Sequence, residues 1–155
     1  MLGELLLLWS LAHGKPPAAS TPTPAPKDGA VVDRASQPVY LIADGKAGAR
    51  VLLDERTAPG LKEAAMSELV MLPGTSVPEH VHEVSAELLY VLEGHGVMTM
   101  GDKTVPVRAG MAIWIPAGVK HSFRLDTQVE PLRAIQVYTP GGPEQRFLKG
   151  PSAKE

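Results

Sequence analysis

Apolar and polar residues alternate over short stretches of this chain, and turn-forming residues separate the stretches. Alternation with a period of two is typical of a β-strand, because successive side chains point to opposite faces. Asp44-Gly45, Pro73-Gly74 and Gly101-Asp102 are among the turn formers between them. The pattern predicts strands at 39–42, 50–53, 65–72, 79–82, 87–93, 96–100, 103–107, 112–115, 121–125 and 132–138.

Helical periodicity is absent from every longer stretch, and only residues 57–64 are a candidate for a short helical turn. Many short strands at regular spacing favour an all-β sandwich or barrel. The chain has 155 residues, enough for one ordinary domain and too few for two. We therefore expect a single all-β domain at 30–149, followed by a short tail at 150–155.

The first residues of the chain have a different composition. Residues 5–12 read LLLLWSLA, an apolar run far shorter than the roughly 18 residues of a membrane-spanning helix but typical of a signal peptide. We predict a signal peptide at 1–14 and a periplasmic or extracellular protein. Met1–Glu4 contains an acid and no Lys or Arg, so the alternative is an apolar segment packed on the domain of a cytoplasmic protein.

Residues 15–29 form a linker rich in Pro, Ala and Thr. Within it, 16–26 reads PPAASTPTPAP and carries no charge. Such a stretch prefers extended polyproline-type conformations, which is typical of a spacer. A terminal segment without a role is the alternative.

Composition and charge exclude several classes of function. The formal net charge is -2, and no basic stripe with interleaved aromatic residues is present, so nucleic-acid binding has no electrostatic basis. The chain contains no cysteine, which excludes disulfides, zinc–thiolate sites and thiol nucleophiles. No apolar run is long enough to predict a membrane span.

Three of the five histidines belong to one pattern with a glutamate: His80, His82, Glu87 and His121. In a strand His80 and His82 point to the same face, and residues 83–86 suit a turn that brings Glu87 beside them. His121 follows the turn at 116–118. The pattern predicts one cluster built from three strands, with side chains that bind first-row transition metals as imidazole or carboxylate.

These residues resemble the two motifs of the cupin superfamily. The first, G-x(5)-H-x-H-x(4)-E-x(6)-G, is complete, whereas the second, G-x(5)-P-x-G-x(2)-H-x(3)-N, has Leu125 in place of the final Asn. The matching positions are Gly74, His80, His82, Glu87 and Gly94 in the first motif and Gly110, Pro116, Gly118 and His121 in the second. Five fixed residues in the first motif would match by chance about once in several million positions at average composition.

The resemblance implies a single-domain β-barrel (jelly roll) similar to small bacterial cupins of the cupin-2 type. It also implies one divalent transition metal on His80, His82, Glu87 and His121. Such a set leaves coordination positions open for a substrate or dioxygen. Iron, manganese, nickel, zinc and copper all stay open as the ion. By analogy with small cupins, a homodimer formed through sheet edges is a further expectation.

Four other residues are candidates for the wall of the pocket: Met98, Trp114, Phe123 and Gln136. Phe123 shares a strand face with His121, and Gln136 lies on the last predicted strand, which in cupins often contributes polar groups to the pocket. Trp114 precedes the turn at 116–118, and burial in the layer between the sheets is its alternative. An apolar wall favours a small organic ligand over a phosphate.

Three functions follow from this interpretation. The first is a metal-dependent enzyme, most plausibly a dioxygenase-like oxidoreductase acting on a small organic substrate, with isomerase chemistry as a variant of the same class. The second is a non-catalytic cupin module of the cell envelope that binds or senses a small molecule. The third is a structural barrel whose metal only supports folding. The resemblance of the fold does not decide among them, because one architecture hosts many functions.

Overall fold

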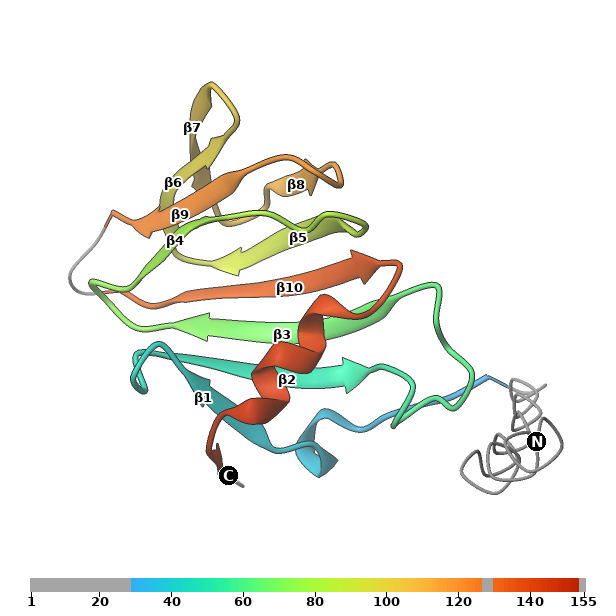
Figure 1. Ribbon diagram of the computed structural model, residues 1–155. Coiled ribbons are helices and arrows are strands. Elements are labelled where there is room, and N and C mark those ends of the chain that lie inside the picture. The colour runs from blue at the N-terminus through green and yellow to red at the C-terminus, as the bar shows by residue number, and fades with distance from the viewer. Residues whose placement is uncertain (1–28, 127–129, 154–155) are drawn as a thin grey trace, which may run out of the picture.

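The structure is a computed structural model that describes residues 29–126 and 130–153, and it is built from two antiparallel sheets (Figure 1). The larger sheet has the strand order β11-β1-β2-β3-β10-β5-β8, and the smaller has the order β4-β9-β6-β7. In chain order the elements are η1 (Arg34–Ser36), β1 (Val39–Ile42), β2 (Ala47–Leu53), β3 (Ala65–Met71), β4 (Ser76–His80), β5 (Ala86–Glu93), β6 (His95–Met100), β7 (Lys103–Arg108), β8 (Ala112–Ile115), β9 (His121–Leu125), β10 (Leu132–Thr139), η2 (Pro143–Lys149) and β11 (Ser152–Ala153). The expected all-β barrel of the jelly-roll type is confirmed.

All ten predicted strands have a counterpart, and the differences lie at their ends. The strand predicted at 79–82 is β4, which begins earlier and ends at His80, so His82 lies beyond the strand. Residues 57–60 form turns and bends and 61–64 are mostly irregular backbone, so the candidate helical turn at 57–64 is absent. The 3-10 helix η2 was not predicted, because a helix of one or two turns is too short to show a period in the sequence.

The core lies between the two sheets. Residues from the larger sheet, such as Val91 and Ala134, join Met98, Phe123 and Leu125 from the smaller one in a single apolar cluster. Strands β6 and β9 approach closely at Gly96, where an added Cβ would lie 2.4 Å from the ring of Phe123. Glycine at this position therefore lets the Phe123 ring pack closely against the backbone of β6.

Leu125 is the position at which the sequence departs from the cupin motif. Its side chain is 3% exposed and belongs to the apolar cluster, and Leu125 pairs with Gly96 across the sheet. An asparagine here would bury an amide among apolar side chains, which is unfavourable without hydrogen-bond partners. The leucine thus extends the core where the motif has a polar residue.

The short helix η2 crosses the larger sheet near β2 and β3 (Figure 1). Pro143 lies in its first turn, where the missing N–H costs no helical hydrogen bond. Arg146 and Lys149 lie in its last turn, where positive charge is favourable. Phe147 is buried against Tyr138 and β2, which fixes the helix to the barrel.

The predicted signal peptide at 1–14 lies outside the described residues, as does the linker at 15–29 except for its last residue. Over the ranges that the structure describes, no helix has the length and apolar character needed to span a membrane.

We predict that Leu125→Ala lowers the free energy of unfolding by about 2–5 kcal/mol, because it removes a buried side chain and leaves a cavity. Leu72→Ala is the matched control, since Leu72 is 48% exposed and its loss is expected to change stability by no more than about 0.5 kcal/mol. Urea unfolding of both variants measures the two values. Equal losses would contradict the placement of Leu125 in the core.

Candidate metal centre

Two histidines of the predicted cluster face each other across a strand pair. His80 ends β4 and is the register partner of His121, the first residue of β9, and their ring centroids lie 4.2 Å apart. Each ring places Nδ1 2.9 Å from a backbone carbonyl oxygen two residues earlier, that of Pro78 for His80 and that of Val119 for His121. A carbonyl oxygen only accepts, so Nδ1 carries the proton in both rings and Nε2 is the atom available to a metal.

His82 reaches the same place from the loop that follows β4. Its backbone carbonyl accepts a hydrogen bond from the Gly118 N–H at 2.9 Å, so the turn that precedes His121 also holds the segment after β4. The ring of His82 packs 5.2 Å from that of His121 and 5.0 Å from that of His80, measured between centroids. The motif glycine Gly118 thus ties the two halves of the site together.

Glu87 lies at the centre of the cluster. Its side chain is buried, and Oε2 lies 3.1 Å from Nε2 of His121 and 3.2 Å from Nε2 of His82. Burial raises the pKa of Glu87, but the contacts from His121, His82 and Gln136 outweigh it and lower the pKa to about 2. The carboxylate is therefore ionised at neutral pH.

The surroundings shift the pKa values of His80 and His121 in opposite directions. Burial and the nearby charges of His121 and Arg146 lower the pKa of His80, although its contact with the Pro78 carbonyl opposes them. Burial lowers the pKa of His121 too, but the contact with Glu87 overcomes it and the net shift is upward. When His121 is protonated on both nitrogens, its Nε2 proton faces Glu87, and a metal ion would have to displace that proton.

The donor set fits a metal ion. One nitrogen or oxygen from each of His80, His82, Glu87 and His121 lies within 4.8 Å of the others. Nε2 of His82 is buried and has no partner with hydrogen-bond geometry, although Glu87 lies within ion-pair distance. A buried nitrogen without a hydrogen bond, beside an ionised carboxylate, fits a site for a divalent transition metal.

Outside these four residues, hydrogen bonds link Glu87 to a chain of polar side chains that runs from the buried Gln136 and Tyr138 to the exposed Arg146. Gln136 donates Nε2 to Glu87 Oε1 at 2.5 Å and to the hydroxyl of Tyr138 at 2.8 Å. Arg146 donates Nη2 to the same hydroxyl at 2.9 Å. Burial and the Glu87 charge both raise the pKa of Tyr138, so the phenol stays neutral. Gln136 therefore fixes the rotamer of Glu87, and Tyr138 fixes Gln136.

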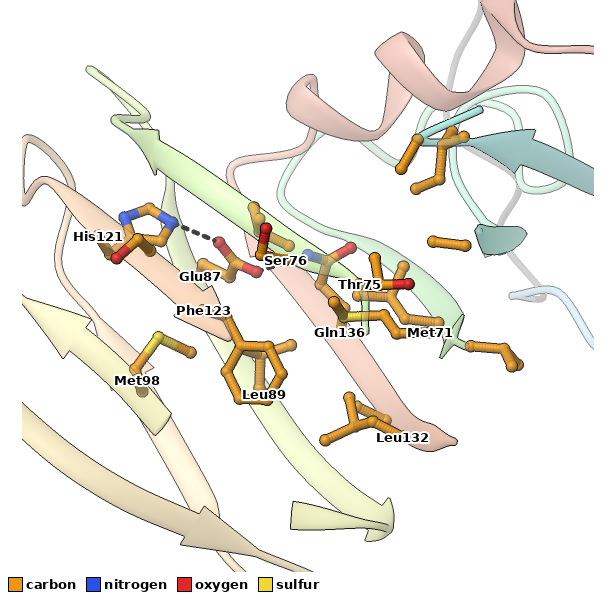
Figure 2. Close-up of a pocket in the computed structure, with 18 of the residues that line it drawn as sticks. Met71, Thr75, Ser76, Glu87, Leu89, Met98, His121, Phe123, Leu132 and Gln136 are labelled. Carbon is orange, nitrogen blue, oxygen red and sulfur yellow. Dashed lines mark hydrogen bonds and ion pairs between the residues drawn. The ribbon is translucent and has the colours of Figure 1, made fainter. Parts of the chain in front are cut away.

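The cluster opens into a cavity of about 360 Å³ inside the barrel. Figure 2 shows Glu87 between His121 and Gln136, with Met98, Leu89, Phe123 and Leu132 along one side. The lining is mostly apolar and also includes Val91 and Ile113. Met98, Phe123 and Gln136 thus lie at the cavity, where the sequence placed them.

Trp114 does not lie there, and the prediction that it lines the pocket is wrong. It is 66% exposed on the outer face of β8, while its neighbours Ile113 and Ile115 point inward. The alternation of the strand decides this, because a residue between two inward side chains must face outward. The alternative of burial between the sheets is wrong for the same reason.

Sequence reasoning missed two residues of the site. Tyr138 shares a strand face with Gln136, which the alternation could have revealed as a second polar residue beside the metal cluster. Arg146 lies on η2 and lines the cavity, but no motif or period in the sequence connects this helix with the barrel.

The chain is similar to known proteins over the segment that contains this site. The family model described as "Cupin domain" matches residues 67–138, the segment that contains all four cluster residues. The polyketide synthase CurC of Streptomyces cyaneus is 36% identical over 75 residues, 48% of this chain and 48% of CurC. The matched segments span about half to two thirds of the first three such relatives.

Two solved structures extend the similarity over more of the chain. A predicted oxalate decarboxylase from Thermotoga maritima superimposes with a TM-score of 0.63 and 26% identity, covering 72% of this chain and 99% of its own. The polyketide cyclase RemF from Streptomyces resistomycificus gives a TM-score of 0.62 and 26% identity, covering 80% of this chain and 83% of its own.

We predict that a divalent transition metal raises the melting temperature of the chelator-treated protein. Metal at 100 times its Kd should add about 2.7 kcal/mol to the free energy of unfolding. His121→Gln should abolish the increase, whereas His95→Gln should retain it, because His95 is half exposed and lies outside the cluster. Thermal unfolding with and without Mn²⁺, Fe²⁺, Ni²⁺, Cu²⁺ or Zn²⁺ measures the effect. An unchanged melting temperature with every ion would contradict the metal site.

Proposed function

The chain belongs to the cupin superfamily, and on this basis we propose that it is a metal-dependent enzyme whose substrate is a small, mostly apolar organic molecule. The observation that carries the proposal is the position of the His/Glu cluster at one end of an apolar cavity. A volume of about 360 Å³ lies within the range of pockets that enclose small-molecule ligands. The substrate would present an oxygen atom to the cluster and its hydrocarbon body to the wall.

Each part of the site has a task in this proposal. Bound to His80, His82, Glu87 and His121, a divalent metal would act as a Lewis acid toward an oxygen of the substrate and offer a position to dioxygen. Gln136 holds the Glu87 carboxylate in one orientation. The apolar wall formed by residues such as Leu89 and Phe123 excludes water and thereby strengthens electrostatic interactions at the cluster.

The character of the wall favours an aromatic or polyketide-like substrate over a compact dianion such as oxalate. A dianion would leave one carboxylate against apolar side chains, which is costly without a partner. An enol or phenol on a ring system would offer its oxygen to the cluster and its ring to the apolar wall. Two of the similar proteins described above, CurC and RemF, are named for polyketide chemistry, which agrees with this substrate class.

We take oxygenation as the first reaction to test, with dioxygen as the oxidant and both of its atoms entering the organic product. Among the described residues that line the cavity, acids and bases other than Arg146 all belong to the metal cluster. A ring closure or isomerisation that needs a separate general base has none in this set. Ring closure that uses the cluster itself would proceed without dioxygen.

The same observation supports a second candidate, a module that binds its ligand without converting it. A cavity with no independent acid or base is sufficient for binding. A ligand would then stabilise the protein without forming a product.

The two candidates are separated by incubating the metal-loaded protein with a panel of aromatic enols and phenols, including the flavonol quercetin. The proposal predicts loss of at least one compound, dioxygen uptake in step with it, and a fall of about 100-fold or more in kcat/KM for His82→Ala. His95→Ala is the matched control and should retain activity. Turnover without dioxygen uptake would replace oxygenation by ring closure or isomerisation, and stabilisation without turnover across the panel would support the binding module.

We also propose that the protein forms a homodimer through the outer face of the larger sheet. Trp114, Tyr90, Leu88 and Leu92 are 66%, 48%, 40% and 38% exposed on the neighbouring strands β8 and β5. A sheet with one face in water normally alternates apolar and polar residues, but β5 is apolar on both faces over 88–92. Such a patch, with aromatic residues and no charge at its centre, suits a second copy of itself.

Trp114→Lys should convert the dimer to a monomer, because two lysines would meet at the centre of the paired faces. Light scattering coupled to size-exclusion chromatography measures the mass of each species. Val31→Lys is the control, since Val31 is fully exposed and precedes η1, outside every strand of the sheet. A monomeric wild-type protein, or a dimer that tolerates Trp114→Lys, would refute the proposed interface.

A further inference from the structure

Arg146 stands at the boundary between the apolar cavity and the surface. It lines the cavity beside His80 and His121, and it also lines a second, more open pocket that contains His82. Among the described residues that line the main cavity, Arg146 is the only lysine or arginine. A positive charge is therefore available at the end of the cavity where the His/Glu cluster lies.

Neutral groups hold the guanidinium in this position. Nη2 donates to the Tyr138 hydroxyl at 2.9 Å, and the guanidinium carbon lies 5.9 Å from the centroid of the Tyr138 ring and 4.9 Å from that of Phe147. Both rings are buried, and cation–π contacts of this kind orient a guanidinium without neutralising it. Tyr138 in turn packs edge-on against His82, with 4.9 Å between the ring centroids, so Arg146 is one residue removed from the cluster.

The charge of Arg146 has no carboxylate partner within ion-pair distance among the described residues. Arg133, by contrast, pairs with Glu68 and Glu93, and Arg56 pairs with Asp54. The side chain of Arg146 is also exposed enough for its remaining N–H groups to reach a ligand. A planar guanidinium with free donors suits a carboxylate, which it can bind through two parallel hydrogen bonds.

We propose that Arg146 is a specificity-determining residue that binds the carboxylate of an amphipathic organic acid whose apolar body lies along the wall of the cavity. This inference rests on the proposed function and narrows its substrate class from apolar molecules in general to those with an anionic group at one end. In this arrangement the apolar wall contacts the hydrocarbon body of the ligand and Arg146 binds its carboxylate. The His/Glu cluster receives another oxygen atom of the same ligand. A neutral ligand of the same shape would leave the guanidinium without a partner.

Isothermal titration calorimetry with two aromatic probes tests the inference on the full chain, both metal-loaded and chelator-treated. The probes are 2-naphthoate and 2-naphthamide, which share a ring system and differ in charge. We expect 2-naphthoate to bind the wild-type protein more tightly than 2-naphthamide. Arg146→Gln should weaken 2-naphthoate by about 10-fold or more, the range for a hydrogen bond to a charged group, and should leave 2-naphthamide within about 2-fold.

Two further variants separate a direct contact from a general effect of charge. Lys149→Gln removes the same charge from the same helix and should leave the binding of both probes unchanged. Arg146→Lys keeps the charge but loses the planar fork, so it should recover part of the affinity for 2-naphthoate. A melting temperature for each variant shows whether the barrel is intact.

The inference is overturned if 2-naphthoate fails to bind the wild-type protein, if it binds no better than 2-naphthamide, or if Arg146→Gln leaves its affinity unchanged. These outcomes differ from failure of the proposed function. Binding of 2-naphthoate that depends on Arg146, in a protein that converts no compound, would retain the anion site and refute the enzyme. Turnover of neutral aromatic compounds that is unchanged in Arg146→Gln would retain the enzyme and refute the anion site.

Discussion

The site depends on one buried carboxylate that keeps its charge. Placing an ionised group inside a barrel is costly unless other groups compensate for the water that it loses. For Glu87 the compensation comes from the rings of His82 and His121 on one oxygen and from the amide of Gln136 on the other. These three contacts come from three separate segments of the chain: the loop after β4, strand β9 and strand β10. The segments must therefore converge on the start of β5.

Antiparallel register produces this convergence. Glu87 is the partner of Tyr138 across β5 and β10, which places Gln136 two residues along the same inner face. His80 is the partner of His121 across β4 and β9, so the two sheets each contribute part of the cluster. A slip of one residue in either pair would turn these side chains to the outer face. The same hydrogen-bond ladders that make the barrel therefore set the geometry of the metal ligands.

The sequence predicts the parts of this arrangement that depend on spacing and alternation. His80, His82, Glu87 and His121 could be found because fixed offsets in short strands leave few possible geometries. Strand alternation alone does not place His82, since β4 ends at His80 and a loop held by a hydrogen bond from Gly118 brings His82 to the cluster. Proximity to the turn at 116–118 does not place Trp114 in the pocket, because strand alternation turns its side chain outward. No local pattern in the sequence predicts that Arg146 lines the cavity. Its position follows from where the short helix η2 docks, which is a tertiary contact.

The inner surface of the barrel is divided between two kinds of chemistry. At one end polar groups are linked in a continuous chain from Arg146 through Tyr138 and Gln136 to Glu87. At the other end Leu89, Phe123 and Leu132 offer no hydrogen-bonding group at all. A molecule that is polar throughout would be desolvated without compensation at the second end, and one that is apolar throughout would leave the first end unsatisfied. The division of the wall therefore supports our proposal of a ligand with two unlike ends, and this argument does not depend on which ion the cluster would bind.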